Sequence, residues 1–143
     1  HLTIVFLGEV KDEEVAAIKK AMDEVKAEPF LLTLSGLGVF SRRGGDIYWL
    51  GVEKNSSLIS IYEQLYQRLI LKGFSLEKRK YKPHVTLGRR IKAPKEFLIN
   101  DFSKDLKAQS VLVNKISLMK SERKNGKLFY TELYTKKLVS CVE

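Results

Sequence analysis

A four-residue pattern that occurs twice constrains this chain more than any other feature. It reads His1-Leu2-Thr3-Ile4 at the start of the sequence and His84-Val85-Thr86-Leu87 farther on, and these copies contain the only two histidines of the chain. Side chains alternate between the two faces of a strand, so each histidine shares a face with the threonine of its copy. We therefore predict two strands that present histidine and threonine on one face and turn four apolar residues into the core: Leu2, Ile4, Val85 and Leu87.

Two such strands placed side by side would surround a small anion, about the size of a phosphate, with two imidazoles and two hydroxyls. Histidine can accept or donate a proton near pH 7, and a hydroxyl can donate a hydrogen bond to a developing oxyanion. A single His-x-Thr segment is uninformative, because threonine is common in strands. A duplication made for structural reasons alone would not need to keep both histidines, so the repeat favours a catalytic pair.

The net charge indicates the kind of binding partner, and the cysteine content indicates the cellular compartment. The net charge is +9 and the isoelectric point about 9.6, which favours an anionic partner, most often a nucleic acid. Cys141 is the only cysteine, so the chain cannot form an internal disulfide, as suits a reducing cytoplasm. The sequence contains no apolar run of the roughly 20 residues that a membrane-spanning helix needs. We expect one cytoplasmic domain over residues 1–143, monomeric and not bound to a membrane.

Hydrophobic patterning predicts an α+β fold. We expect strands over 1–7, 30–35, 47–53, 83–89, 110–119 and 128–135. Helices are expected from Asp12 to about Ala27 and from Ser56 or Ser57 to a C-terminal cap at Gly73. The apolar residues that these helices should turn inward are Val15, Ile18, Met22 and Val25 in the first and Leu58, Ile61, Leu65 and Leu69 in the second. Turns are expected in the glycine loop of 41–46 and at Asn125-Gly126, a strong hairpin signal.

The motifs and the phrases around them resemble the 2H phosphoesterase superfamily, and within it the LigT-like RNA 2′,3′-cyclic phosphodiesterases, also described as 2′-5′ RNA ligases. The matching phrases are HLTIVFLGEV, LSGLGVFSRRGGDIYWLGV, GFSLEKRKYKPHVTLGRR and ISLMKSERKNGKLFYTELYTKKL, in the order that the family has them. The resemblance implies a bilobal fold, with two pseudo-symmetric α+β lobes around a central cleft and one motif from each lobe. Family members normally carry a strand and a helix before the first motif, so we expect His1 to be an internal residue of a longer chain.

The resemblance also implies a reaction. RNA that ends in a 2′,3′-cyclic phosphate would be hydrolysed to a 2′-phosphomonoester, with no metal ion and no other cofactor. By family analogy, His84 is the general base and His1 is the general acid that protonates the departing O3′. Thr3 and Thr86 would donate hydrogen bonds to the non-bridging oxygens of the phosphate. The same groups would also join a 5′-hydroxyl to a cyclic phosphate, the reverse ligation that forms a 2′-5′ linkage.

Arg89 and the other basic residues are open to two interpretations. The family has a phosphate-contacting arginine at the place of Arg89, but strand alternation puts Arg89 on the face away from His84 unless a bulge or strand end occurs at Gly88. The alternative is a solvated arginine. The basic segment 78–82 and Arg42-Arg43 could contact an RNA backbone or face solvent. Three aromatic residues could stack on a base or belong to the core: Phe40, Tyr48 and Trp49.

Other functions are open from the sequence. A sister activity of the superfamily, such as cleavage of 2′-5′ oligonucleotides or of nucleotide cyclic phosphates, would use the same four motif residues. A non-catalytic RNA-binding module would explain the positive charge but not the repeated motif. A metallohydrolase would need more ligands than two histidines, and no carboxylate cluster lies near either motif. The sequence therefore favours the cyclic phosphodiesterase.

Overall fold

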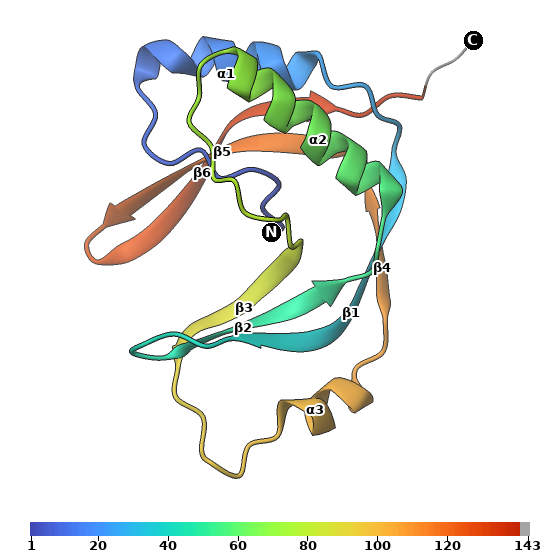
Figure 1. The fold of residues 1–143 in the computed structure, drawn as a ribbon, viewed down its shortest axis with the longest axis vertical. Coiled ribbons are helices and arrows are strands. Elements are labelled where there is room, and N and C mark those ends of the chain that lie inside the picture. Colours follow the sequence, from blue (N-terminus) through green and yellow to red (C-terminus); the bar gives the residue numbers. More distant parts are fainter. Residues whose placement is uncertain (141–143) are drawn as a thin grey trace. The chain divides into compact units, whose positions relative to one another are not determined.

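The computed structural model describes residues 1–140, so Cys141 and the prediction that rests on it lie outside the described residues. The chain forms two compact units. Unit 1 contains His1–Phe6, Leu31–Asn55 and Lys78–Val111, and unit 2 contains Leu7–Phe30, Ser56–Glu77 and the residues from Leu112 onward. Both units combine helix with strand, which confirms the predicted α+β class (Figure 1). In the part of the chain that the structure describes, no helix is long and apolar enough to cross a membrane.

Unit 1 is built on a four-stranded sheet with the strand order β3-β2-β1-β4 (Figure 1). Its strands are β1 (Phe30–Phe40), β2 (Asp46–Val52), β3 (His84–Ile91) and β4 (Gln109–Val113), and β2 is antiparallel to both of its neighbours. Strand β1 is longer than the strand that the sequence predicts over 30–35. The predicted glycine turn joins β1 to β2, and Asp46 Oδ1 accepts a hydrogen bond from the Arg42 N–H across it (3.2 Å).

A short helix that the sequence did not predict, α3 (Ile99–Asp105), lies beside β1. The pairing of β1 with β2 is irregular between Leu34 and Leu37, and the Leu37 N–H donates a hydrogen bond to Ser103 Oγ of the helix (3.0 Å). The irregular pairing leaves the Leu37 N–H without a partner on β2, and the Ser103 hydroxyl of α3 accepts its hydrogen bond instead. With only seven residues, α3 shows too little of a 3.6-residue period to be found from the sequence.

Unit 2 holds most of the buried core of the described chain. Its helices are α1 (Val15–Asp23), which follows a 3₁₀ turn (η1, Asp12–Glu14), and α2 (Ser56–Leu71), and its hairpin consists of β5 (Lys115–Lys124) and β6 (Lys127–Lys137). The buried apolar residues of this unit are Ile18, Ala21, Met22, Val25, Leu58, Ile61, Leu65, Leu69, Ile116, Leu118 and Leu138. These include every residue that the second helix was predicted to turn inward, and all those predicted for the first helix except Val15, which is half-buried.

The first helix is shorter than expected. The sequence predicts a helix to about Ala27, but α1 ends at Asp23. The side-chain amide of Gln64 on α2 accepts a hydrogen bond from the Lys26 N–H and donates one to the Lys26 carbonyl, both at 2.9 Å. A backbone held in this way cannot continue the hydrogen-bond ladder of the first helix. The predicted cap of α2 is confirmed at Gly73, where φ is +91°.

The hairpin of unit 2 contains the turn that the sequence indicates most strongly. Asn125 and Gly126 have φ angles of +51° and +75°, as a type I′ turn requires. The prediction of a single strand over 110–119 is wrong, because Asn114 separates β4 from β5 and its carbonyl accepts a hydrogen bond from the Leu138 N–H (2.8 Å). As a result β4 and β5 belong to different sheets.

Polar contacts hold the hairpin beside α1 within unit 2. The Tyr134 hydroxyl donates a hydrogen bond to the Asp23 carboxylate, and this bond raises the pKa of Tyr134. On the hairpin itself, the pKa of Glu132 is lowered to about 2 by hydrogen bonds from Ser117, Thr135 and Lys115. Glu132 is therefore a carboxylate throughout the physiological pH range.

Candidate functional site

The two His-x-Thr motifs meet at the edge of the sheet in unit 1, where Leu2 forms an isolated antiparallel bridge with Val85 of β3. The predicted strand over 1–7 is wrong beyond this bridge, since no other residue of the segment pairs as a strand. The Tyr81 hydroxyl donates a hydrogen bond to the Thr3 carbonyl (3.1 Å). This carbonyl is therefore bonded to a side chain rather than to the backbone of a neighbouring strand. Both motifs belong to unit 1, rather than one to each unit.

The bridge determines which side chains share a face. In an antiparallel pair, residues one step to either side of a bridge lie opposite each other, so the register of this bridge would set Thr3 across from His84 and His1 across from Thr86. Opposite residues point to the same face, here the face away from the two bridging side chains. His1 and His84 are diagonal neighbours, a relation that in sheets separates Cα atoms by roughly 7–8 Å. This register is the one that would place the four predicted motif residues on one face.

The imidazole of His84 is held in one orientation. Its Nδ1 lies 2.7 Å from the carbonyl oxygen of Lys82, and because a carbonyl can only accept, Nδ1 carries the hydrogen. In the neutral ring the lone pair is then on Nε2. The Phe40 ring packs edge-on against the imidazole with 5.1 Å between centroids, and the Trp49 ring lies at 6.0 Å. His84 thus has a defined tautomer in which Nε2 is the atom that can accept a proton.

The indole of Trp49, one of the two aromatic rings beside His84, packs against Gly38. Trp49 pairs with Gly38 on β1 and with Thr86 on β3, so its indole lies on the face of the motif residues. A Cβ at Gly38 would lie 2.0 Å from Cζ2 of the indole, so only glycine leaves room for the ring. The indole Nε1 is buried and has no hydrogen-bond partner within residues 1–140. Trp49 and Phe40 are therefore half-buried neighbours of His84 rather than members of a separate core.

A β-bulge in β3 changes the prediction for Leu87 and Arg89. Two adjacent residues of β2 pair with Thr86 and Gly88, so Leu87 is an extra residue in β3. Leu87 is 58% exposed, and its predicted place in the core is wrong because a bulged residue has no partner across the strand pair. The other apolar motif residues, Leu2, Ile4 and Val85, are half-buried. Arg89 is exposed and lies with Arg90 in a second irregularity of this pairing, between Gly88 opposite Tyr48 and Ile91 opposite Asp46, so strand alternation does not assign it to either face.

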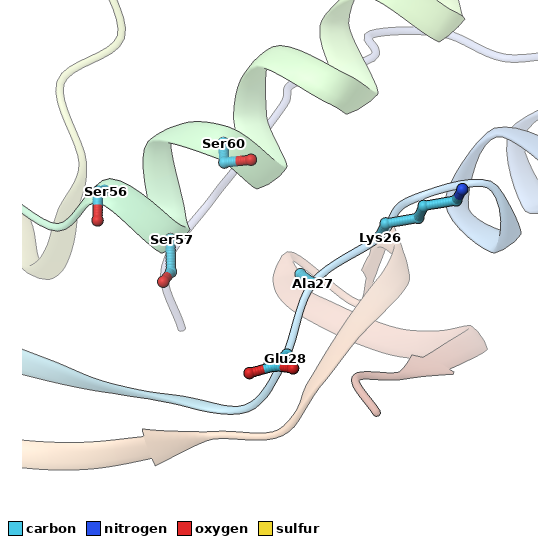
Figure 2. Close-up of a pocket in the computed structure, with 6 residues that line it drawn as sticks. All are labelled: Lys26, Ala27, Glu28, Ser56, Ser57 and Ser60. Carbon is cyan, nitrogen blue, oxygen red and sulfur yellow. The ribbon is translucent and has the colours of Figure 1, made fainter. Parts of the chain in front are cut away.

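A separate pocket lies within unit 2 (Figure 2). It has a volume of about 270 Å³ and lies between the first turn of α2 and the segment before β1, and its lining residues are Lys26, Ala27, Glu28, Ser56, Ser57 and Ser60. None of the predicted site residues lines it. Within residues 1–140, no three side chains of His, Cys, Asp or Glu gather as they would around a metal ion. Because this pocket contains none of the predicted residues, the candidate site is the edge of the sheet at β3, where the two motifs meet.

Two His-x-Thr motifs that meet at the edge of one sheet are the arrangement expected of a two-histidine phosphoesterase, the class that the sequence resembles. Residues 1–125 match the 2′-5′ RNA ligase superfamily, and the chain belongs to it. The RNA 2′,3′-cyclic phosphodiesterase of Aeropyrum pernix is 33% identical over 147 residues, which cover 98% of this chain and 82% of that protein. The resemblance stated from the motifs is thereby confirmed.

Solved structures and further relatives agree with this family. The crystal structure of E. coli LigT complexed with 3′-AMP matches with a TM-score of 0.80 at 28% identity, over 98% of this chain and 77% of that chain. The RNA 2′,3′-cyclic phosphodiesterase of Thermotoga maritima is 40% identical over 92 residues, or 62% of this chain and 49% of that protein. The chain spans about half or less of the length of several such curated relatives. The predicted 2H phosphoesterase fold is confirmed by the likeness to LigT.

Proposed function

We propose that this protein hydrolyses the 2′,3′-cyclic phosphate ends of RNA to 2′-phosphomonoesters with a pair of histidines, without a metal ion or another cofactor. One observation carries the proposal: an isolated antiparallel bridge joins Leu2 to Val85, the residues that stand between the histidine and the threonine of the two motifs. The names of the relatives, RNA 2′,3′-cyclic phosphodiesterases, support the same substrate class, as does the LigT structure with 3′-AMP. A net charge of +9 suits an RNA partner.

In the proposed reaction, Nε2 of His84 accepts a proton from water as the water oxygen forms a bond to phosphorus. The bond between phosphorus and O3′ breaks, and His1 gives its proton to the departing O3′, so the phosphate stays on O2′. The hydrogen bond from His84 Nδ1 to the Lys82 carbonyl supports this assignment, because it leaves Nε2 as the basic atom of the neutral ring.

The other site residues would stabilise the negative charge that grows on the non-bridging oxygens. The hydroxyls of Thr3 and Thr86 would donate hydrogen bonds to these oxygens in the transition state. Arg89 follows the bulge in β3, and its guanidinium could bond two oxygens at once. With a 5′-hydroxyl in place of water, the same groups would form a 2′-5′ linkage and release O3′ in the same way.

An oligonucleotide that ends in a 2′,3′-cyclic phosphate tests the proposal. We expect the protein, in a buffer that contains EDTA, to convert this end to a 2′-phosphate, because O3′ is the leaving oxygen. Phosphorus NMR and comparison with 2′- and 3′-phosphate standards identify the product. A 3′-phosphate as the main product would overturn the assignment of acid and base. No turnover by folded protein, or turnover only after a divalent cation is added, would overturn the proposal as a whole.

A further inference from the structure

Unit 1 carries two groups of basic residues at opposite ends of β3. The first, here called the arginine end, consists of Arg42, Arg43, Arg89 and Arg90. The second, here called the lysine segment, is residues 78–82, which lead into the start of β3. All four side chains of the arginine end are exposed, and none of them forms an ion pair within residues 1–140. The arginine end is thus a concentration of positive charge without ion pairs in the described part of the chain.

Backbone contacts assemble the arginine end. Asp46 at the start of β2 pairs with Ile91 at the end of β3, which sets the loop between β1 and β2 beside the end of β3. A Cβ at Gly45 would lie 2.5 Å from the carbonyl carbon of Arg90, so the loop packs directly against this residue. Arg90 itself has a φ of +56°, a conformation that is uncommon for residues other than glycine. These contacts hold the two parts of the arginine end together.

Arg42 extends the arginine end toward the motif residues. Its guanidinium carbon lies 5.7 Å from the centroid of the Phe40 ring, and the Phe40 ring lies 5.1 Å from that of His84. The Phe40 ring is therefore a neighbour of both the Arg42 guanidinium and the His84 imidazole. The nearby carboxylate of Asp46 accepts a hydrogen bond from the backbone N–H of Arg42, whereas Nη1 of the guanidinium donates to the Ser41 carbonyl (3.0 Å). Arg42 and Arg89 thus continue the candidate site toward the end of the sheet.

The positions of the two histidines relative to β3 indicate the direction in which the bound RNA chain would run. The antiparallel bridge between Leu2 and Val85 directs His1 toward Thr86, and so nearer the arginine end than His84. In the proposed reaction His1 protonates O3′, so the ribose that carries this oxygen lies on the side of the arginine end. The nucleotides that precede the cyclic phosphate are attached to that ribose through its O5′, and their phosphates follow in the same direction.

We propose that the arginine end binds the phosphates that precede the cyclic phosphate, so that the preferred substrate is an oligonucleotide rather than a cyclic mononucleotide. This inference rests on the proposed function, because the direction of the RNA follows from the roles of the two histidines. A guanidinium can bond two phosphate oxygens at once, and Arg42 presents its planar group beside an aromatic ring next to the site. The lysine segment lies on the opposite side, from which the water attacks.

The preference for an oligonucleotide over a cyclic mononucleotide, expressed as the ratio of the two kcat/KM values, tests this inference. In Arg42→Ala/Arg43→Ala the ratio should fall about tenfold or more, because hydrogen bonds between charged groups are lost. It should also become less sensitive to salt, since fewer counterions are released when RNA binds. The matched control is Lys78→Ala/Lys80→Ala, which removes the same charge from the lysine segment and should change the ratio by less than about twofold.

Each result decides the question. An equal fall of the ratio in both double variants would indicate general attraction of RNA to positive charge and would overturn the inference. An unchanged ratio in active Arg42→Ala/Arg43→Ala protein would also overturn it, while the proposed function would stand. No turnover of either substrate by the unaltered protein would instead overturn the proposed function. Thermal unfolding of both double variants, compared with the unaltered protein, verifies that they are folded.

Discussion

Replacing His84 with alanine should lower kcat/KM for a cyclic-phosphate oligonucleotide by about a hundredfold or more, the usual contribution of a positioned base. The bond from Nδ1 to the Lys82 carbonyl and the edge-on contact with Phe40 orient the ring before substrate binds. Alanine removes the Nε2 atom that takes the proton from water. Steady-state rates over a range of substrate concentrations separate the expected loss in kcat from any change in KM.

The His1→Ala variant is the companion of this experiment. We expect a loss of the same order, because the departing O3′ would leave without a proton. The double variant should be less than multiplicatively worse, since residues that act as a unit are not additive in their effects. Thermal unfolding of each variant separates a lost function from a lost fold. A His84→Ala enzyme with nearly full activity would contradict the proposed base.

The Gly38→Ala variant should lose about 1–3 kcal/mol of unfolding free energy, the usual cost of an extra methyl group in packed space. The added Cβ would lie 2.0 Å from Cζ2 of Trp49, an atom of a rigid ring. The indole must move, and because its ring lies 6.0 Å from that of His84, kcat should fall as well. Urea unfolding measures the loss of stability, and steady-state kinetics measures the loss of activity.

Trp49→Phe provides the control for Gly38→Ala, because phenylalanine lacks the second ring that the added methyl group meets. The cost of Gly38→Ala should be smaller in the Trp49→Phe background, since substitutions at contacting residues are not additive. Equal costs in both backgrounds would show that the clash does not come from the indole. A Gly38→Ala variant as stable as the unaltered protein would contradict the packing of the ring over Gly38.

Local sequence patterns predict the parts of this fold that local physics determines. The inward face of α2 is predicted because its apolar residues recur at helical spacing, and all of them are buried: Leu58, Ile61, Leu65 and Leu69. The turn at Asn125-Gly126 is predicted because few residue pairs adopt two positive φ angles readily. The four motif residues could be found from the sequence for a similar reason, since the repeat of His-x-Thr is visible without any knowledge of pairing.

Features that depend on distant partners could not be predicted in this way. Leu87 looks like a core residue by alternation, and its bulge is visible only once the pairing of β3 with β2 is known. The orientation of His84 depends on the carbonyl of Lys82, and a backbone carbonyl leaves no trace in the sequence. Gly38 did carry a signal, because a glycine inside a strand marks the close approach of another group, here the ring of Trp49.

The dependence of kcat/KM on pH tests the two-histidine reaction most directly, because that reaction needs one neutral and one protonated imidazole in the same molecule. For a cyclic-phosphate oligonucleotide we predict a bell-shaped profile, whose two limbs belong to the pair rather than to either residue alone. Thr86→Ala should lower the bell without moving its limbs, because a hydroxyl does not titrate in this range. A profile that is flat between about pH 5 and pH 9 would contradict the assignment of His1 and His84 as acid and base.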